Sequence, residues 1–427
     1  MTKEKSTVPR LRFPGFTDAW KQRKLGEVAD FSIKTNSLSR DKLSSYFYEV
    51  QNIHYGDILT KYDAILDVCN KELPSIIGST ISDFADALLI EGDIVFADAA
   101  EDSTVGKAIE VRNFKGKNVV SGLHTIVARP KVSYAPYYLG YLINSTAYHN
   151  QILPLMQGTK VSSISKANLK STTVVFPTLP EQEAIGSFFS DLDQLITLHQ
   201  RKLDDVKELK KALLQKMFPK GNGNDFPELR FPEFTDAWKQ RKLGEVAISF
   251  DYGLNSAATE YDGENKYLRI TDIDDDSREF NISNLTSPEI NLFGLDEYRL
   301  SIGDILFART GASVGKSYIY RSVDGKVYFA GFLIRVKIKD TFNPDFVFQN
   351  TLTSNYERFI SITSMRSGQP GVNAQEYSNY EIMFPTLSEQ EAIGSFFSDL
   401  DQLITLHQRQ LNHLKLLKKA LLQQMFI

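Results

Sequence analysis

Apolar residues recur in alternating steps of four and three along two long segments of the chain, which predicts two long helices. The first pattern runs through Ile185, Phe189, Leu192, Ile196, His199, Leu203, Val206, Lys210, Leu213 and Met217. The second has Ile393, Phe397, Leu400, Ile404, His407, Leu411, Leu414, Lys418, Leu421 and Met425 at the equivalent places. A heptad pattern that lasts about five heptads is typical of coiled-coil packing. Each helix is expected to begin after Pro177 or Pro385, because proline blocks an earlier start.

The two predicted helices are copies of one another. Residues 176–218 and 384–426 are identical at 36 of 43 aligned positions. A shorter repeat, 9–29 against 227–247, differs at two positions and carries the chain's two tryptophans, Trp20 and Trp238. We call these two shorter pieces the docking segments, and expect each tryptophan to anchor the same contact in its half. Two such helices in one chain favour antiparallel pairing, with the halves related by a pseudo-two-fold axis.

Two regions of little mutual identity lie between the repeats, and we call 30–175 the first insert and 248–383 the second. Short apolar runs predict strands, and a helical stretch follows them in each insert, at 136–152 and 344–360. The predicted strands are 93–97, 125–128 and 172–176, and then 304–308, 329–338 and 380–384. The fold class is therefore mixed α/β, with both inserts sharing one topology. The expected divisions are 1–175, 176–219, 220–383 and 384–427.

Composition indicates a folded protein of the cytoplasm. The chain has 427 residues, of which 42% are hydrophobic and 11% aromatic, enough for full-sized cores. Cys69 is the single cysteine, which excludes an intramolecular disulfide and a multi-cysteine metal site. No apolar run reaches the roughly 18 residues that span a bilayer, and the first residues do not resemble a signal peptide, so no membrane partner is expected.

Charge is distributed unevenly within each insert, although the net charge of the chain is only -4. Residues 30–102 carry 14 acidic and 5 basic side chains, whereas 103–175 carry 1 acidic and 9 basic. The second insert repeats the trend, with 12 acidic and 3 basic over 248–297 and 7 against 10 over 298–383. Each insert thus has a more basic C-terminal half, which is compatible with phosphate contacts or with chance asymmetry.

Two stretches of the sequence resemble catalytic or metal-binding motifs, and neither fits. Residues 310–317 resemble a phosphate-binding loop, but Thr310 stands where the motif requires glycine. The acidic run that starts at Asp272 resembles a calcium loop, but Ser277 replaces its glycine and Ser283 its terminal glutamate. We therefore expect no metal, no cofactor and no enzymatic activity in this chain.

The combination of features resembles the specificity subunit of type I restriction-modification enzymes. It consists of two unlike α/β inserts, each followed by a near-identical long helix, and a repeated Trp-x-x-x-x-Leu-Gly-Glu-Val that begins at Trp20 and Trp238. The resemblance implies two target recognition domains that each read half of a split double-stranded DNA sequence. It also implies two adenine methyltransferase subunits docked on the helix pair and two ATP-dependent translocase/nuclease subunits. S-adenosylmethionine, ATP and Mg are then expected in those partner subunits.

Candidate DNA contacts are polar side chains in the glycine-containing loops of the basic halves, because Arg and Asn can pair with base edges and Lys, Ser and Thr with phosphates. In the first insert they are Ser103, Lys107, Thr159, Lys160 and Ser162. In the second they are Arg269, Arg309, Thr310, Ser313, Lys316, Arg366, Ser367, Gln369 and Asn373. Asp98 roughly occupies the place of Arg309 in the first insert, so the role of that arginine does not transfer. The candidates for the coiled coil and for partner docking are Trp20, Trp238, Ile185, Phe189, Leu192, Ile196, Leu203, Ile393, Phe397, Leu400, Ile404 and Leu411.

Two other functions stay open at this point. The chain could be a coiled-coil scaffold whose inserts bind proteins, in which case no salt-dependent, sequence-selective DNA retention is expected. A self-contained endonuclease or methyltransferase is disfavoured by the missing motifs.

Overall fold

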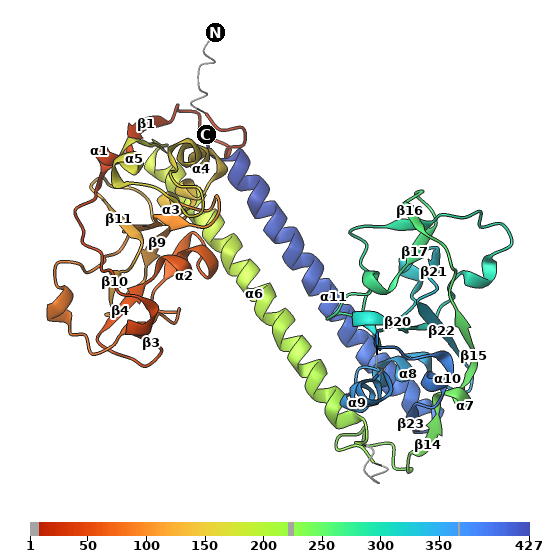
Figure 1. Ribbon diagram of the computed structural model, residues 1–427. Helices are drawn as coiled ribbons and strands as arrows, with labels where there is room; N and C mark the ends of the chain where they lie inside the picture. The colour runs from red at the N-terminus through yellow and green to blue at the C-terminus, as the bar shows by residue number, and fades with distance from the viewer. Residues whose placement is uncertain (1–7, 221–225, 366–367) are drawn as a thin grey trace. The chain divides into compact units, whose positions relative to one another are not determined.

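The computed structural model describes residues 8–220, 226–365 and 368–427, which form two compact units (Figure 1). The first unit is Met1–Leu198 together with Gln410–Ile427, and the second is His199–Arg409. Each unit therefore contains one insert, one docking segment and a part of both long helices. No helix among the described residues is both long and apolar enough to pass through a membrane.

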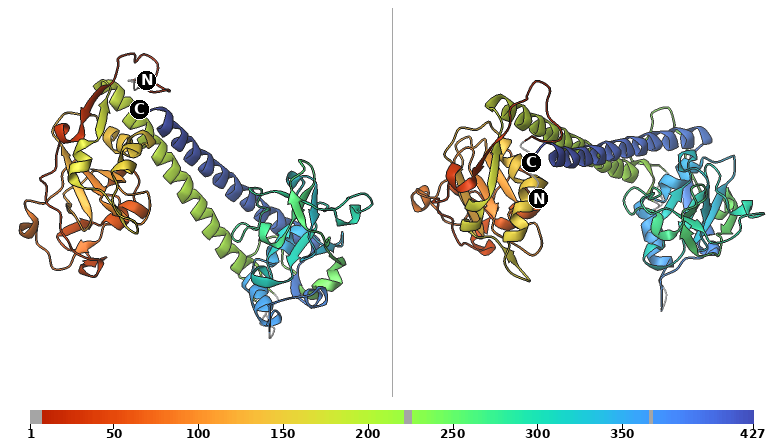
Figure 2. Two further views of the ribbon diagram at one scale, coloured as in Figure 1. Left: turned by 45° about the horizontal axis from the view of Figure 1, so that its top comes forward. Right: turned by 90° about the horizontal axis from the view of Figure 1, so that it is seen from above.

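The long helices are α6, Leu179–Met217, and α11, Leu387–Gln424, and they pack together in both units (Figure 2). In the first unit the early part of α6 meets the late part of α11, where Asp193 pairs with Lys418 at 2.5 Å. In the second unit the late part of α6 meets the early part of α11, where Lys210 pairs with Asp401 at 2.5 Å. Both contacts require antiparallel helices, so the predicted pairing is confirmed.

The heptad residues near the start of each long helix join the core of an insert, and others near the middle are buried outside these cores. Ile196 and Leu400 are half-buried, whereas eight others are buried: Ile185, Phe189, Leu192, Leu203, Ile393, Phe397, Ile404 and Leu411. In the first unit α6 and α11 join the core of the first insert, and in the second unit they join the core of the second.

The first unit contains a five-stranded sheet of order β2-β11-β7-β9-β5 and a four-stranded sheet of order β10-β4-β6-β3. Its strands are β1 Lys21–Lys24, β2 Ala29–Asp30, β3 Leu43–Ser44, β4 Val50–Ile53, β5 Ile65–Asp67, β6 Ser75–Ile76, β7 Ile94–Ala97, β8 Ala99–Ala100, β9 Ala108–Arg112, β10 Asn118–Ser121, β11 Thr125–Pro130, β12 Ser162–Ser163 and β13 Thr173–Phe176. Its short helices are α1 Leu25–Val28, α2 Tyr55–Thr60, α3 Tyr138–Ile143, α4 Thr146–Ile152 and α5 Lys166–Ser171.

The second unit contains a four-stranded sheet of order β15-β22-β19-β20. Its strands are β14 Lys239–Lys242, β15 Ala247–Tyr252, β16 Ala258–Glu260, β17 Lys266–Leu268, β18 Thr286–Pro288, β19 Ile305–Ala308, β20 Ser317–Ile319, β21 Val327–Phe329, β22 Leu333–Ile338 and β23 Glu381–Phe384. Its short helices are α7 Leu243–Val246, α8 Pro344–Asn350, α9 Ser354–Thr363 and α10 Ala374–Ser378.

The two inserts share their central strand pairings, as predicted, whereas the outer strands differ: β5 extends the main sheet in the first insert only. β7 lies antiparallel between β9 and β11 in the first insert, and β19 lies antiparallel between β20 and β22 in the second. β4 pairs in parallel with β10, and β17 pairs in parallel with β21. The low identity of the inserts therefore reflects different side chains on the same frame.

Some predicted elements are interrupted by local backbone chemistry. The helix predicted at 136–152 is split into α3 and α4, because the Ser145 hydroxyl caps α4 by accepting from the Tyr148 amide. The helix predicted at 344–360 is likewise split into α8 and α9. The strand predicted at 329–338 is divided between β21 and β22, since Gly331 and Phe332 turn the chain between them.

The docking segments join the inserts to the ends of the long helices in the same way. β1 pairs with β13 with Lys21 opposite Phe176, and β14 pairs with β23 with Lys239 opposite Phe384. The buried Trp20 ring lies 6.4 Å from Phe426 at the end of α11, and Trp238 lies 6.3 Å from Phe218 at the end of α6.

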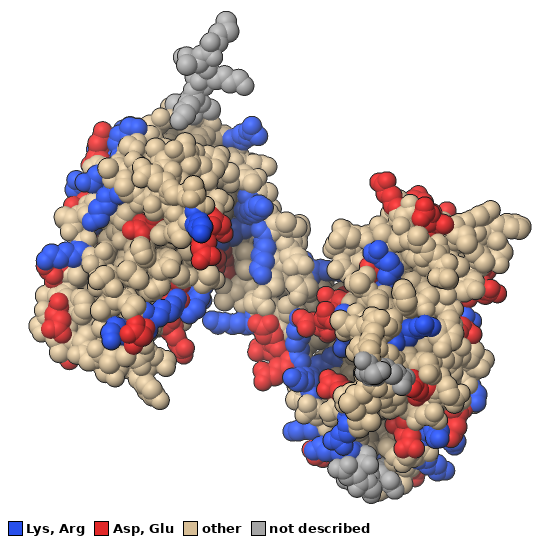
Figure 3. Space-filling view, in the orientation of Figure 1, with Lys and Arg blue, Asp and Glu red and all other residues tan. Residues whose placement is uncertain are grey.

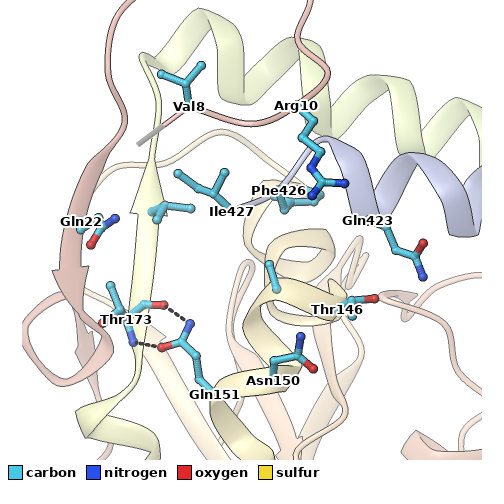
Figure 4. Close-up of a pocket in the computed structure, with 12 residues that line it drawn as sticks. Val8, Arg10, Gln22, Thr146, Asn150, Gln151, Thr173, Gln423, Phe426 and Ile427 are labelled. Atoms are coloured by element: carbon cyan, nitrogen blue, oxygen red, sulfur yellow. Dashed lines mark hydrogen bonds between the residues drawn. The ribbon is translucent and has the colours of Figure 1, made fainter. Parts of the chain in front are cut away.

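Matching backbone bonds hold each docking segment to the last turn of a helix. The amide of Leu11 donates to the carbonyl of Gln424 at 3.0 Å, and the amide of Leu229 donates to the carbonyl of Lys216 at 2.9 Å. Figure 4 shows a pocket, of about 550 Å³, that is lined by Val8 and Arg10 together with Gln423, Phe426 and Ile427. The start of the docking segment therefore adjoins the end of α11.

Candidate nucleic-acid interface

Two loops that hold most of the predicted DNA contacts lie side by side in each insert. In the first insert β12 pairs with β8, with Ser162 opposite Ala100, so the loop 157–163 lies beside the segment 98–107. In the second insert Thr310 forms an isolated bridge with Gly371, and the amide of Gly311 donates to the carbonyl of Pro370 at 3.0 Å. The structure thus brings these sequence-distant candidates together within each unit.

Asp98 and Arg309 occupy the same backbone position of the two inserts. The amide of Asp98 donates to the carbonyl of His124, and the amide of Arg309 donates to the carbonyl of Phe332, both at 3.0 Å. Their own carbonyls accept from Ile164 and Val372, both at 2.9 Å. The two inserts therefore carry opposite charges at the same backbone position, directly after β7 in the first insert and directly after β19 in the second.

Arg309 lies half-buried over an aromatic ring. Its guanidinium carbon is 5.0 Å from the centroid of the Tyr252 ring, which favours a cation–π contact and limits the orientations of the guanidinium. A short 3-10 turn, Gly311–Ser313, follows it and leads into β20. This strand–turn–strand arrangement has no helix after the turn, in contrast to a phosphate-binding loop.

Asp98 borders a polar groove of about 410 Å³. Its carboxylate lies 3.3 Å from Nδ1 of His124. Burial raises the pKa of the Asp98 carboxyl, and the neighbouring His124 opposes that rise. The groove is lined by Thr35, Asn36, Ser37, Leu38, Phe84, Asp98, Leu123, His124 and Thr125. Sequence reasoning selected none of these nine residues as a site, and the signal that could have found Asp98 was its match to Arg309.

Three of the cationic candidates already have partners inside the protein. Nζ of Lys107 donates to the carbonyl of Leu59 at 3.1 Å, and burial lowers the pKa of this lysine. Lys316 pairs with Asp275 at 2.5 Å. The guanidinium of Arg269 donates two hydrogen bonds, both of 2.8 Å, to the Asp272 carboxylate, so these side chains support the shape of the loops.

The other candidates range from exposed side chains to helix caps. Asn373 caps α10 by accepting from the amide of Glu376 at 2.9 Å. Thr310, Ser313 and Ser162 are half-buried, whereas four are exposed: Ser103, Thr159, Lys160 and Gln369. Arg366 and Ser367 lie outside the described residues.

The charge on the surface is mixed rather than uniformly basic. Figure 3 shows Lys and Arg interspersed with Asp and Glu on the visible face of each unit. Among the described residues, no three His, Cys, Asp or Glu side chains are grouped as metal ligands would be. The arrangement can supply directional hydrogen bonds from a few loop side chains, which suits contacts to base edges.

Comparison with solved structures shows the same fold elsewhere. The S subunit of a type I restriction-modification system from M. genitalium matches 98% of this chain and 99% of its own, with a TM-score of 0.65 and 15% identity. At that identity the likeness concerns the fold alone.

The sequence relatives are matched over a smaller part of their length than this solved structure is. A putative type I restriction enzyme MjaX specificity subunit of Methanocaldococcus jannaschii is 25% identical over 57% of this chain and 57% of its own length. The type I restriction enzyme MjaVIII specificity subunit of the same organism is 23% identical over 62% of this chain and 64% of its own. The matches therefore span less than two thirds of these relatives. The family described as type I restriction modification DNA specificity domain matches residues 17–208 and again 235–416, and the chain belongs to this family.

Proposed function

We propose that the chain is the DNA sequence-recognition subunit of a type I restriction-modification complex, in which each insert reads one half of a bipartite, asymmetric double-stranded site. One observation carries this proposal. The two inserts have the same backbone frame but place a carboxylate, Asp98, and a guanidinium, Arg309, at the same position. Two readers of different half-sites need a constant frame with different chemistry at the contact positions.

The chemical steps belong to partner subunits in this proposal. Two adenine methyltransferase subunits would bind S-adenosylmethionine, and two translocase/nuclease subunits would use ATP and Mg. The complex would act in the cytoplasm. This chain would contribute DNA recognition and the placement of its partners.

Exposed leucines on the long helices include two equivalent pairs that suit contacts with those methyltransferase subunits. Leu195 and Leu198 of α6 are 40% and 47% exposed, and their equivalents Leu403 and Leu406 of α11 are 38% and 50% exposed. The heptad residues are mostly buried within the chain, so they serve its own fold. Two equivalent leucine pairs suit two copies of one partner.

The length of the helices is proposed to set the gap between the half-sites. A four-residue insertion beside Leu203 of α6, combined with the same insertion beside Leu411 of α11, adds about 6 Å of helix. Sequencing of adenine methylation in cells should then show unchanged half-sites and an altered gap. The same four residues inserted into the sequence 221–225 should leave the gap unchanged. An active complex that keeps its original gap after the helix insertions would contradict the ruler function.

A scaffold that binds other proteins is the alternative. DNA retention by the complex separates the two functions, because phosphate neutralisation releases counterions and makes binding fall steeply with salt. Retention that is sequence-selective and salt-dependent supports DNA recognition. A complex that assembles but retains all DNA sequences equally would favour the scaffold.

A further inference from the structure

We propose that Asp98 specifies one C·G base pair in the half-site of the first insert, by accepting a hydrogen bond from the N4 amino group of its cytosine. Arg309 then specifies a guanine from the same backbone position of the second insert. This inference rests on the proposed function and names the bases that two particular side chains would read.

Asp98 and Arg309 hold equivalent backbone positions in the two inserts. Four backbone hydrogen bonds, two at Asp98 and two at Arg309, fix these residues in the same way on equivalent strands. Because these hydrogen bonds fix the main chain, both side chains extend from the same position of the fold. A change from carboxylate to guanidinium at this point therefore changes recognition without changing the fold.

Asp98 and Arg309 carry charges of opposite sign, and the sign decides which groups of DNA each can contact. A carboxylate repels phosphate, so a contact from Asp98 to DNA is a contact to a base rather than to the backbone. An ionised carboxylate only accepts hydrogen bonds, and cytosine N4 is the major-groove donor that Asp and Glu pair with. Arg309 carries the complementary chemistry, because a guanidinium can donate two hydrogen bonds to O6 and N7 of guanine.

The Asp98 carboxylate is accessible from the surface of the protein. The Asp98 side chain is 28% exposed, and it opens into the polar groove of about 410 Å³. His124 approaches one carboxylate oxygen, Oδ1, and a carboxylate has acceptor capacity on both oxygens. His124 is itself 51% exposed, and such solvent-facing polar contacts stabilise a fold little. The contact with His124 therefore orients the Asp98 carboxylate and contributes little to the stability of the fold.

The test compares variants of the full chain in complex with its methyltransferase subunits. Methylation motifs in cells and binding to randomised double-stranded oligonucleotides are measured for Asp98→Ala and Arg309→Ala. We expect Asp98→Ala to reduce discrimination about 5- to 150-fold at one C·G pair of one half-site, and to leave the other half-site unchanged. Arg309→Ala should do the same at one G·C pair of the other half-site.

Matched controls distinguish this effect from a general loss of charge. Glu91 is an exposed carboxylate just before β7, near the end opposite Asp98, and Arg299 is an exposed arginine before β19. Glu91→Gln and Arg299→Ala should leave every position of the motif unchanged. Asp98→Asn keeps the size of the side chain and should move the preference at that position from cytosine towards adenine, because asparagine pairs with adenine N6 and N7.

The outcomes separate this inference from the proposed function. A wild-type complex without a bipartite motif would refute the proposed function itself. A wild-type bipartite motif with uniform weakening in Asp98→Ala, or with relaxation at an A·T pair, would refute only the role of Asp98. If Asp98→Ala does not fold, Asp98→Asn decides, and an unchanged motif in that variant also refutes the inference.

Discussion

The Nδ1 atoms of His199 and His407 lie 3.3 Å apart, so equivalent residues of the two helix copies meet one another. Both side chains are half-buried, and their ring centroids are 5.5 Å apart. A polar pair in a heptad seam fixes alignment at some cost in stability. The contact therefore marks the register in which one copy of the helix pairs with the other.

Replacement of both histidines by leucine should stabilise the helix pair. His199→Leu/His407→Leu replaces a polar contact by half-buried apolar surface, which should raise the free energy of unfolding by about 1 to 2 kcal/mol. Thermal and urea denaturation measure this change. His413 is exposed on α11, so His413→Leu should leave stability within about 0.5 kcal/mol. A double variant less stable than the wild type would mean that the histidine pair contributes attraction rather than register alone.

The ion pair of Lys210 with Asp401 offers a second test of the register. Lys210 is 12% exposed and Asp401 is 29% exposed, and Gln349 also donates to this carboxylate at 2.7 Å. Lys210→Met leaves a half-buried carboxylate without its cation, and should lower the free energy of unfolding by about 1 to 3 kcal/mol.

The pair of Lys220 with Glu228 is the control for that variant. Both of its side chains are more than half exposed, so Lys220→Met should cost less than about 1 kcal/mol. Equal losses in Lys210→Met and Lys220→Met by urea denaturation would show that burial of the Lys210 pair has no stabilising consequence.

A buried carboxylate at the start of each long helix provides the largest expected effect. Arg12 donates to both oxygens of Glu181 at 2.5 and 2.7 Å, and the Glu181 side chain is fully buried. The hydrogen bond to Glu181 raises the pKa of the Arg12 guanidinium, despite a lesser opposing effect of burial. Arg12→Ala should cost about 3 to 5 kcal/mol, because it leaves a buried charge unpaired.

Denaturation and limited proteolysis of the docking segment measure that loss. The exposed Arg10 supplies the control, and Arg10→Ala should stay within about 0.5 kcal/mol of the wild type. Arg230→Ala should behave like Arg12→Ala, because Arg230 makes the same two bonds to the buried Glu389, both at 2.7 Å. A small effect of either variant would show that the buried carboxylate does not need its arginine partner for stability.

The helix pair and the shared topology could be predicted from sequence because they depend on repeated patterns. Heptad spacing places Phe189 and Leu411 on buried faces, and short, continuous apolar runs mark buried strands such as β7 and β19. The break between α3 and α4 could not be predicted in the same way. It depends on one hydroxyl, that of Ser145, which competes locally with an otherwise continuous apolar pattern.

The candidate site was harder to predict, because its members come together only in the fold. Arg309 was selected from its place in a polar loop, but Tyr252 beneath it lies 57 positions earlier in the sequence. Asp98 directly follows β7 and His124 directly precedes the neighbouring strand β11, and neither belongs to a recognisable motif. Lys316 looked like a free cation in sequence, whereas Asp275 pairs with it in the structure.

The start of the first docking segment lies beside the end of α11. The Leu229 amide bonds to the Lys216 carbonyl across the linker, and the Leu11 amide bonds to the Gln424 carbonyl without one. Val8 and Ile427 line the same pocket (Figure 4). The repeat itself therefore gives the length of the link that would connect the ends: the seven residues 220–226, inserted between Ile427 and Pro9.

A circular permutant tests whether the two docking contacts are interchangeable. The design places a copy of residues 220–226 between Ile427 and Pro9 and opens the chain between Asn222 and Gly223, so the first link loses its covalent continuity and the second gains it. We expect the melting temperature to remain within a few degrees, because the permutation preserves every described contact of Trp20 and Trp238. As a control, opening the chain within α3 of the same closed form should prevent folding, because all six residues of that helix are buried. A permutant opened at Asn222 that also fails to fold would show that the two docking segments differ despite their matching bonds.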